Sequence, residues 1–267
     1  MRTASLPGEC LTRTKSRHPT VTVRKASVED LDAILDIGLA ALPHDPQWHY
    51  RFPYRHEFPE DTRDFTRARY KEFLEDGEKQ WCVMVAESAD AQHPRGAKPV
   101  AFAIWEIVNI RKHFGFCTPS KTSTNTSTPR TAPSVKRRRD GHAQRMQAWN
   151  KTTSWSKQRI FDDIYGTGHF HLQILATHPS YRKRGAATAL CNVGLAAATR
   201  LNMVVSVFAS PMGRRLYRQL GFCYVNEVRI QVEGEDQFVI LTAMLYVPDV
   251  PAFPRYDFWS PNSAMTT

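Results

Sequence analysis

The stretch from residue 169 to residue 201 constrains the fold of this chain more than any other. Its first part, residues 170–177, is apolar enough for a buried strand. Pro179 ends that strand, because proline lacks the N–H that a β-ladder needs. From residue 185 the composition changes to Ala, Leu, Val and Thr, and apolar residues recur at helical spacing, at Leu190, Val193, Gly194 and Ala197. The sequence therefore predicts a strand, a short loop and a helix that packs on a sheet.

A basic loop that contains glycine joins this strand to the helix. Its three consecutive cations, Arg182, Lys183 and Arg184, are followed by small side chains at residues 185–187. The first turn of a helix presents free N–H groups and a partial positive charge. The small side chains let a ligand approach that backbone closely. These features meet the physical needs of a pyrophosphate site, and a surface turn with three solvated cations is the alternative interpretation.

The same loop resembles the signature of a known family. Arg182-x-x-Gly185-x-Ala187 fits the Gln/Arg-x-x-Gly-x-Gly/Ala pattern of the GCN5-related N-acetyltransferase (GNAT) superfamily, with alanine in place of the commoner last glycine. Tyr217 followed by Gly221 and Phe222 is also similar to a frequent GNAT pattern. The glycine patterns of P-loop and dinucleotide-binding proteins do not occur in the chain. The resemblance covers residues 20–247, apart from an insertion.

The resemblance implies an α/β (α+β) fold. We expect a GNAT-like mixed, mostly antiparallel seven-stranded sheet flanked by helices, with a splayed parallel pair at the centre formed by residues 170–177 and 203–208. The periodicity predicts the other strands and the main helices at residues 20–25, 27–42, 60–75, 81–87, 100–108, 211–221, 222–231 and 237–246. Ser210 is expected to cap the helix at 211–221. The aromatic, proline-rich residues 44–59 are expected to be irregular, either as a packed loop or as a wall of the acceptor pocket.

The chain is expected to divide into three parts. Residues 1–19 read as a disordered tail, residues 20–248 as the N-acetyltransferase domain, and residues 249–267 as a C-terminal extension. A basic, low-complexity insertion interrupts the domain at about 109–168. Within the insertion, the Ser, Thr and Pro content predicts poor order over residues 117–145, and a helix is expected at about 145–161.

The formal net charge of +10 is concentrated in the N-terminal tail and the insertion. The rest of the chain is slightly acidic, which argues against nucleic-acid binding by the core. The compact basic run at 136–139 is interpreted first as a solvated linker, with a nuclear-import signal or a nucleic-acid patch as alternatives. We therefore expect a cytoplasmic protein, and the basic run leaves a nuclear location as the alternative. No apolar run is long enough for a membrane span, so no membrane partner is expected.

The five cysteines are scattered, odd in number and contain no Cys-x-x-Cys pair. This usage suits a reducing compartment and predicts neither a disulfide framework nor a metal site.

The resemblance implies an acyl-CoA-dependent N-acyltransferase that transfers acetyl from acetyl-CoA to an amine by direct attack in a ternary complex. The expected acid is Tyr217, whose ordinary pKa of about 10 is close to that of a thiol. The base is left open between Glu106, His169 and water. The acceptor is a small-molecule or protein amine. The expected cofactor contacts are Leu175, Ala176, Thr177, Arg182, Lys183, Arg184, Gly185, Ala186, Ala187, Thr188 and Ser210.

A second function class fits the same sequence. The chain could be a non-catalytic binding module that keeps the fold and uses its basic insertion to bind nucleic acid or an acidic protein. The two classes differ in where the ligand binds, because one depends on the loop at 182–188 and the other on the insertion.

Overall fold

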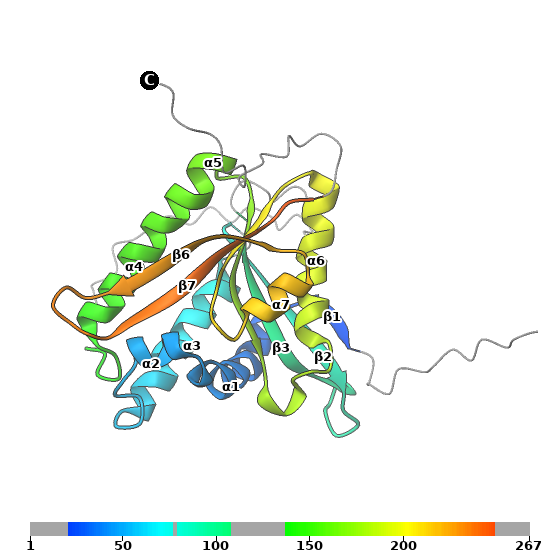
Figure 1. Cartoon of the computed structure of the whole chain (residues 1–267). Helices are drawn as coiled ribbons and strands as arrows, with labels where there is room; N and C mark the ends of the chain where they lie inside the picture. The colour runs from blue at the N-terminus through cyan, green and yellow to red at the C-terminus, as the bar shows by residue number, and fades with distance from the viewer. Residues whose placement is uncertain (1–20, 77–78, 108–136, 249–267) are drawn as a thin grey trace, which may run out of the picture.

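The computed structural model describes residues 21–76, 79–107 and 137–248, which form a seven-stranded sheet with helices on both faces (Figure 1). The strand order is β1-β2-β3-β4-β5-β7-β6. The strands are β1 Thr22–Lys25, β2 Trp81–Ala89, β3 Ala97–Glu106, β4 Phe170–Thr177, β5 Val205–Ala209, β6 Cys223–Gln231 and β7 Phe238–Tyr246. Every neighbouring pair is antiparallel except β4 and β5. The predicted fold class is thereby confirmed, including the central parallel pair.

The two parallel strands stay together for only three residue pairs, from Phe170–Val205 to Leu172–Val207. On its other edge, β4 pairs with β3, and the register shifts where one extra residue, Gln173, stands on β4. Such a bulge bends a strand and increases its twist. The side chain of Gln173 is exposed although β4 is the middle strand of the sheet. The sheet is therefore open between β4 and β5 beyond Leu172.

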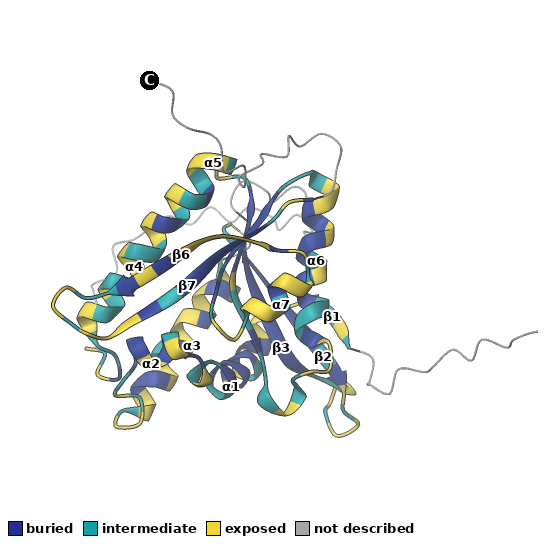
Figure 2. Ribbon diagram, in the orientation of Figure 1, coloured by how far each residue is buried: buried dark blue, intermediate teal, exposed yellow. Residues whose placement is uncertain are grey.

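Two groups of helices cover the two faces of the sheet (Figures 1 and 2). The helices are α1 Leu31–Ala41, α2 Pro46–Arg51, α3 Pro59–Glu75, α4 Ala143–Lys157, α5 Asp163–Tyr165, α6 Ala186–Leu201 and α7 Arg214–Gln219. One face carries α6 over the largest buried cluster. The other face carries α1 and α3 over β2 to β4, and α4 over β6 and β7. Among the described helices, none is long and apolar enough to cross a membrane.

The contact between α6 and the sheet depends on one glycine. A Cβ built on Gly194 would lie 2.5 Å from the ring of Trp105, which is fully buried on β3. The absence of a side chain lets the helix lie close against this indole, and the apolar spacing that predicted the helix supplies the rest of the interface. This close packing fixes the start of α6, and thus the loop at 182–188, relative to β4.

Two local predictions were wrong. Residues 44–59 are not wholly irregular, because α2 begins at Pro46 after the Asp45 carboxylate accepts a hydrogen bond from the Gln47 N–H at 3.3 Å. Ser210 does not cap the next helix either. Its carbonyl accepts the Arg214 N–H at 3.1 Å, residues 211–213 form a turn, and α7 starts after Gly213.

The expectation of poor order over residues 117–145 falls largely outside the described residues, which resume at residue 137. From there the chain has a defined path. Arg139 donates to both oxygens of the buried Asp61 carboxylate, at 2.7 and 2.9 Å. Arg138 binds the buried Asp140 in the same two-point manner, at 2.7 and 3.0 Å. Arg139 therefore ties the segment before α4 to α3, whereas Arg138 pairs within that segment, and both cations have defined partners that a solvated linker would lack.

Candidate active site

The opening between β4 and β5 lies where the two faces of the sheet communicate. Tyr217 belongs to the cluster on the α6 face. His171 lies on the opposite face, beside Phe161 and Phe208. The side chains of Tyr217 and His171 therefore lie on opposite faces of the sheet.

The basic loop has the backbone geometry that an anion site needs. Lys183 and Gly185 have positive φ angles of 60° and 86°, and α6 begins directly afterwards at Ala186. The N–H of Ala189 donates to the Gly185 carbonyl at 2.8 Å, so the helical ladder starts there. The N–H groups in the first turn, which includes Ala187 and Thr188, have no acceptor within the helix. Such N–H groups are free to bind a ligand at the N-terminus of α6.

The three cations of this loop are not equivalent. Arg182 is half-buried and donates to the Ala41 carbonyl at 3.3 Å, so it braces the loop against the end of α1. Arg184 is exposed and lies 5.0 Å from the centre of the Tyr181 ring. Lys183 is exposed as well. An anion at the loop would thus meet Lys183 and Arg184 as exposed charges, whereas the guanidinium of Arg182 is partly engaged in the contact with α1.

The predicted contacts on β4 have different surroundings. Ala176 is buried against the α1 side, whereas Leu175 is half-buried on the α6 side. The hydroxyl of Thr177 is buried, and within the described chain it has no hydrogen-bond partner. Ser210 is half-buried at the end of β5. The free hydroxyl and the unpaired edge of β4 beyond Leu172 are consistent with a ligand that runs along this strand.

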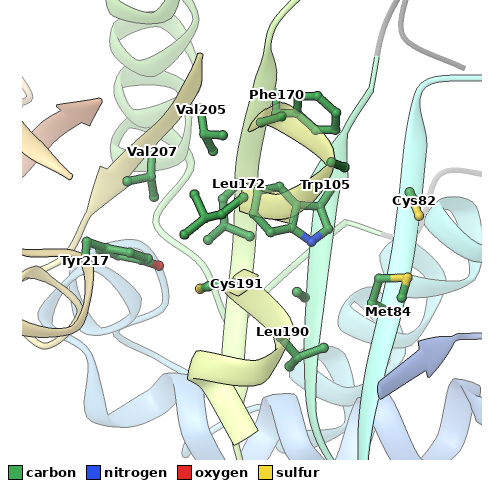
Figure 3. Close-up of a cluster of buried hydrophobic side chains, with 14 of the residues drawn as sticks. Cys82, Met84, Trp105, Phe170, Leu172, Leu190, Cys191, Val205, Val207 and Tyr217 are labelled. Atoms are coloured by element: carbon green, nitrogen blue, oxygen red, sulfur yellow. The ribbon is translucent and has the colours of Figure 1, made fainter. Parts of the chain in front are cut away.

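The side chain of Tyr217 is buried, and its hydroxyl points inward toward Cys191 (Figure 3). Burial is the main reason that the pKa of Tyr217 lies well above its usual value, and Cys191 raises it further. The phenol therefore keeps its proton at any pH at which the protein is handled. Tyr217 is available as a hydrogen-bond donor at the α6 side of the opening.

A cavity of about 540 Å³ lies on the opposite side of the opening, under α4. It extends from Gln173 and His171 on β4 to the polar inner side of α4. Its lining consists of Gln47, Gln80, Trp81, Glu106, Trp149, Thr153, Ser154, Lys157, Gln158, Asp162, Asp163, Thr167, His171, Leu172, Gln173, Phe208 and Leu241. Residues 153–167, which the sequence assigned to an insertion, thus form one wall of the cavity.

A turn of π-helix, residues 158–162, places two oppositely charged residues together in this wall. The wider helical turn brings positions five residues apart onto nearly the same side, which an α-helix does not do. Lys157 Nζ lies 3.0 and 3.2 Å from the two Asp162 carboxylate oxygens, and 3.6 Å from Glu106 Oε2. Glu106, a candidate base from the sequence, is therefore in the cavity but bound to a cation.

Two histidines and a serine form a buried hydrogen-bonded chain on β4 and β5. His169 Nδ1 lies 2.7 Å from the Gly166 carbonyl, which can only accept, so Nδ1 carries the proton. His169 Nε2 is then the acceptor for the Ser206 hydroxyl at 2.9 Å. Ser206 Oγ in turn accepts from His171 Nδ1 at 2.8 Å. This assignment leaves His171 Nε2 with its lone pair, and His171 borders the cavity.

Burial lowers the pKa of both histidines below the ordinary value of 6.5, and His171 is affected more strongly. Lys157 and His169 contribute to the low pKa of His171. Both rings are therefore uncharged at neutral pH. An uncharged imidazole with a free Nε2 can accept a proton from a group in the cavity.

This arrangement predicts how stability depends on pH. As the pH falls through 6.5, the unfolded chain binds more protons on these histidines than the folded chain does, so stability must fall as the pH is lowered. The slope that each histidine contributes is at most about 1.4 kcal/mol per pH unit, between pH 6.5 and its lower pKa in the folded chain. Thermal unfolding between pH 7.5 and 5.5 measures the loss. His171→Gln should flatten the curve, and an equally steep curve in that variant would contradict the assignment.

The sequence interpretation named Tyr217, Glu106 and His169 but did not recognise His171, Ser206 and Gln173 as residues of this site. Residues two apart on a strand lie on one face, so His169 and His171 together were the available signal. Ser206 and Gln173 had no such signal, because their roles depend on strand register. Within the described chain, no group of three or more His, Cys, Asp or Glu side chains is placed to hold a metal ion.

The mixed sheet with a splayed parallel pair and the basic loop at the start of α6 are what the resemblance to the GNAT superfamily implied. A family model described as the acetyltransferase (GNAT) family matches residues 152–222. A Stachybotrys chartarum protein named acetyltransferase is 25% identical over 222 residues, which are 82% of this chain and 87% of that protein. The resemblance to the GNAT superfamily is confirmed.

Solved structures share the fold at low sequence identity. A mosquito arylalkylamine N-acetyltransferase-like protein superimposes with a TM-score of 0.51 at 14% identity, over 85% of this chain and 100% of that one. A Drosophila melanogaster polyamine N-acetyltransferase, described as forming N-acetylagmatine, gives a TM-score of 0.51 at 15% identity, over 85% and 100% of the two chains. At this level of identity, the likeness establishes the fold alone.

Proposed function

We propose that this protein is an acyl-CoA-dependent N-acyltransferase that transfers acetyl from acetyl-CoA to an amine in a ternary complex. The observation that carries the proposal is the opening beyond Leu172, because it has a protonated phenol on one side and an uncharged imidazole on the other. Aminolysis of a thioester needs such a pair, since the amine must lose a proton and the thiolate must gain one.

The described residues fit acetyl-CoA as the acyl donor. The α6 N-terminus, with Lys183 and Arg184 exposed beside it, would hold the pyrophosphate. The unpaired edge of β4 and the free Thr177 hydroxyl would hold the pantetheine arm by hydrogen bonds. Backbone N–H groups beyond Leu172 that face β5 have no strand partner in the described chain. They would stabilise the negative charge that develops on the carbonyl oxygen.

The proposed reaction begins with the acceptor amine in the cavity under α4. His171 Nε2 accepts one proton from the nitrogen as the C–N bond forms at the thioester carbon. Ser206 and His169 hold the imidazole of His171 in the orientation that keeps Nε2 toward the cavity. The C–S bond then breaks, and the Tyr217 hydroxyl donates a hydrogen bond or its proton to the departing sulfur. The products are an amide and free CoA thiol.

The size and lining of the cavity support a small amine as the acceptor. Its volume of about 540 Å³ suits a small molecule, and its wall contains Glu106 and Asp162 beside the aromatic Trp149. The solved structures of similar fold include proteins named for arylalkylamines and polyamines. A small amine acceptor agrees with both observations.

A screen of amines for thiol release from acetyl-CoA tests this function, and Tyr217→Phe tests the acid. The substitution removes one oxygen and keeps the ring that packs against Phe222. We expect turnover to fall by about 10²-fold, the lower end of the range for general acids, because the raised pKa makes full proton transfer harder. Affinity for CoA should stay near that of the wild type. Thiol release from no amine in the screen would contradict the function, and unchanged turnover in Tyr217→Phe would contradict the acid role alone.

A further inference from the structure

Three charged side chains meet inside the cavity under α4. Lys157 Nζ contacts the Asp162 carboxylate at 3.0 Å and approaches Glu106 at 3.6 Å. All three side chains are largely buried, with 15–21% of their surface exposed. Two carboxylates thus share one ammonium, and the cluster keeps a net negative charge.

The other charged groups around the cavity do not cancel this charge. Asp163 also lines the cavity, but its carboxylate pairs at 3.4 Å with Arg159, which does not line the cavity. Lys157 is the single Lys or Arg among the described residues that line the cavity. The neighbouring histidines are uncharged at neutral pH, because burial lowers their pKa. The cavity therefore lacks one positive charge.

The nitrogen that is acylated cannot supply the positive charge that the cavity lacks. That nitrogen must be uncharged when it attacks, and a carboxylate next to it would favour its protonated form. A second basic group on the same molecule has no such requirement. It would stay charged throughout the reaction and could remain beside the two carboxylates. The aromatic ring of Trp149 and the apolar Phe208 and Leu241 line the cavity for the carbon chain between the two groups.

We propose that the acceptor carries two basic groups, and that Glu106 and Asp162 form a subsite for the one that is not acylated. This inference rests on the proposed function, since it names the class of amine that the transferase accepts. The distal group is an ammonium or a guanidinium. Lys157 is the internal counter-ion that occupies the subsite in part, and it competes with the acceptor for the two carboxylates.

The test compares 1,4-diaminobutane with n-pentylamine, which has a methyl group in place of the second ammonium. For the wild type we expect kcat/KM to favour the diamine by about 10-fold, a typical gain for one desolvated charge contact. Glu106→Gln and Asp162→Asn should each lower this preference toward unity, mainly through KM for the diamine. Lys157→Met should raise it, because both carboxylates are then left for the ligand. Lys151→Met, at an exposed position of the same helix, is the matched control and should leave the ratio unchanged.

The variants separate this role from a catalytic one. If Glu106 were the base, Glu106→Gln would slow both amines equally and leave the ratio intact. Asp162 also approaches His169 Nδ1 at 3.7 Å, so agreement between the Glu106 and Asp162 variants is required. Equal kcat/KM for the two amines in the wild type, or a ratio that neither variant changes, overturns the proposal.

A binding measurement keeps the subsite testable apart from the reaction. The diamine should raise the melting temperature of the wild type more than n-pentylamine does. The increase caused by the diamine should be largest in Lys157→Met, where two buried carboxylates lose their partner. If the diamine stabilises the protein in this order but no amine releases thiol, the subsite stands and the transferase function fails. If amines are acetylated but the two ligands stabilise all variants alike, the subsite is refuted and the transferase function stands.

Discussion

Replacing Gly185 with glutamate should abolish the binding of acetyl-CoA. Gly185 has a φ of 86°, in the left-handed region that residues with a Cβ rarely adopt. A glutamate there either strains the loop or moves the first turn of α6 away from its position. It also places a carboxylate where the proposed pyrophosphate lies, and two like charges at this distance repel. Both effects act on the same step, so no binding should remain detectable by titration calorimetry.

A matched control separates loss of the site from loss of the fold. Gly234 in the hairpin between β6 and β7 has a similar φ of 81°, and a Cβ there also meets no atom within 4 Å. Gly234→Glu should therefore show a comparable change in melting temperature with unchanged affinity for CoA. Lys183→Ala should weaken binding only modestly, because fixed N–H groups lose less entropy on binding than a long side chain does. Wild-type affinity in Gly185→Glu would remove the cofactor from the loop at 182–188.

Local sequence signals were enough to predict the strand, loop and helix of the part that we propose as the donor site. The strand at 170–177, the glycine at 185 and the start of α6 follow one another directly in the chain. Each was visible in composition and spacing, since proline ends a strand and small apolar residues at helical spacing begin a helix. The structure keeps the strand, loop and helix of this segment as predicted and adds one contact, the hydrogen bond from Arg182 to the Ala41 carbonyl.

The acceptor side could not be predicted in the same way, because it is assembled from distant segments. Ser206 joins His169 to His171 only through the parallel register of β4 and β5. Lys157 faces Asp162 because one turn of the helix is wider than an α-helical turn, and composition does not reveal that. The basic run was read as solvated for a similar reason, since Asp61, the partner of Arg139, lies on α3. A deletion through residues 137–160 would remove one wall of the cavity, so it cannot test a nucleic-acid role alone.

Replacing His171 with glutamine should lower turnover by about 10²–10⁴-fold, the usual range for loss of a general base. Glutamine is close in size to histidine, but its amide does not accept a proton at neutral pH. The substitution lies on the cavity side of the sheet, away from the loop at 182–188. Affinity for CoA should therefore remain within about threefold of the wild type, which separates the chemical step from donor binding.

Two further variants decide how the imidazole acts. Ser206→Ala removes the acceptor of the His171 Nδ1–H and should lower turnover less than His171→Gln does, because Nε2 is retained but its orientation is no longer fixed. His93→Gln, in the loop between β2 and β3, controls for the loss of a histidine elsewhere and should have no effect. The measurement is single-turnover kinetics with acetyl-CoA bound in advance. Unchanged turnover in His171→Gln would show that His171 is not the base and would leave Glu106 or water as candidates. It would not affect the proposal that the loop at 182–188 binds the cofactor.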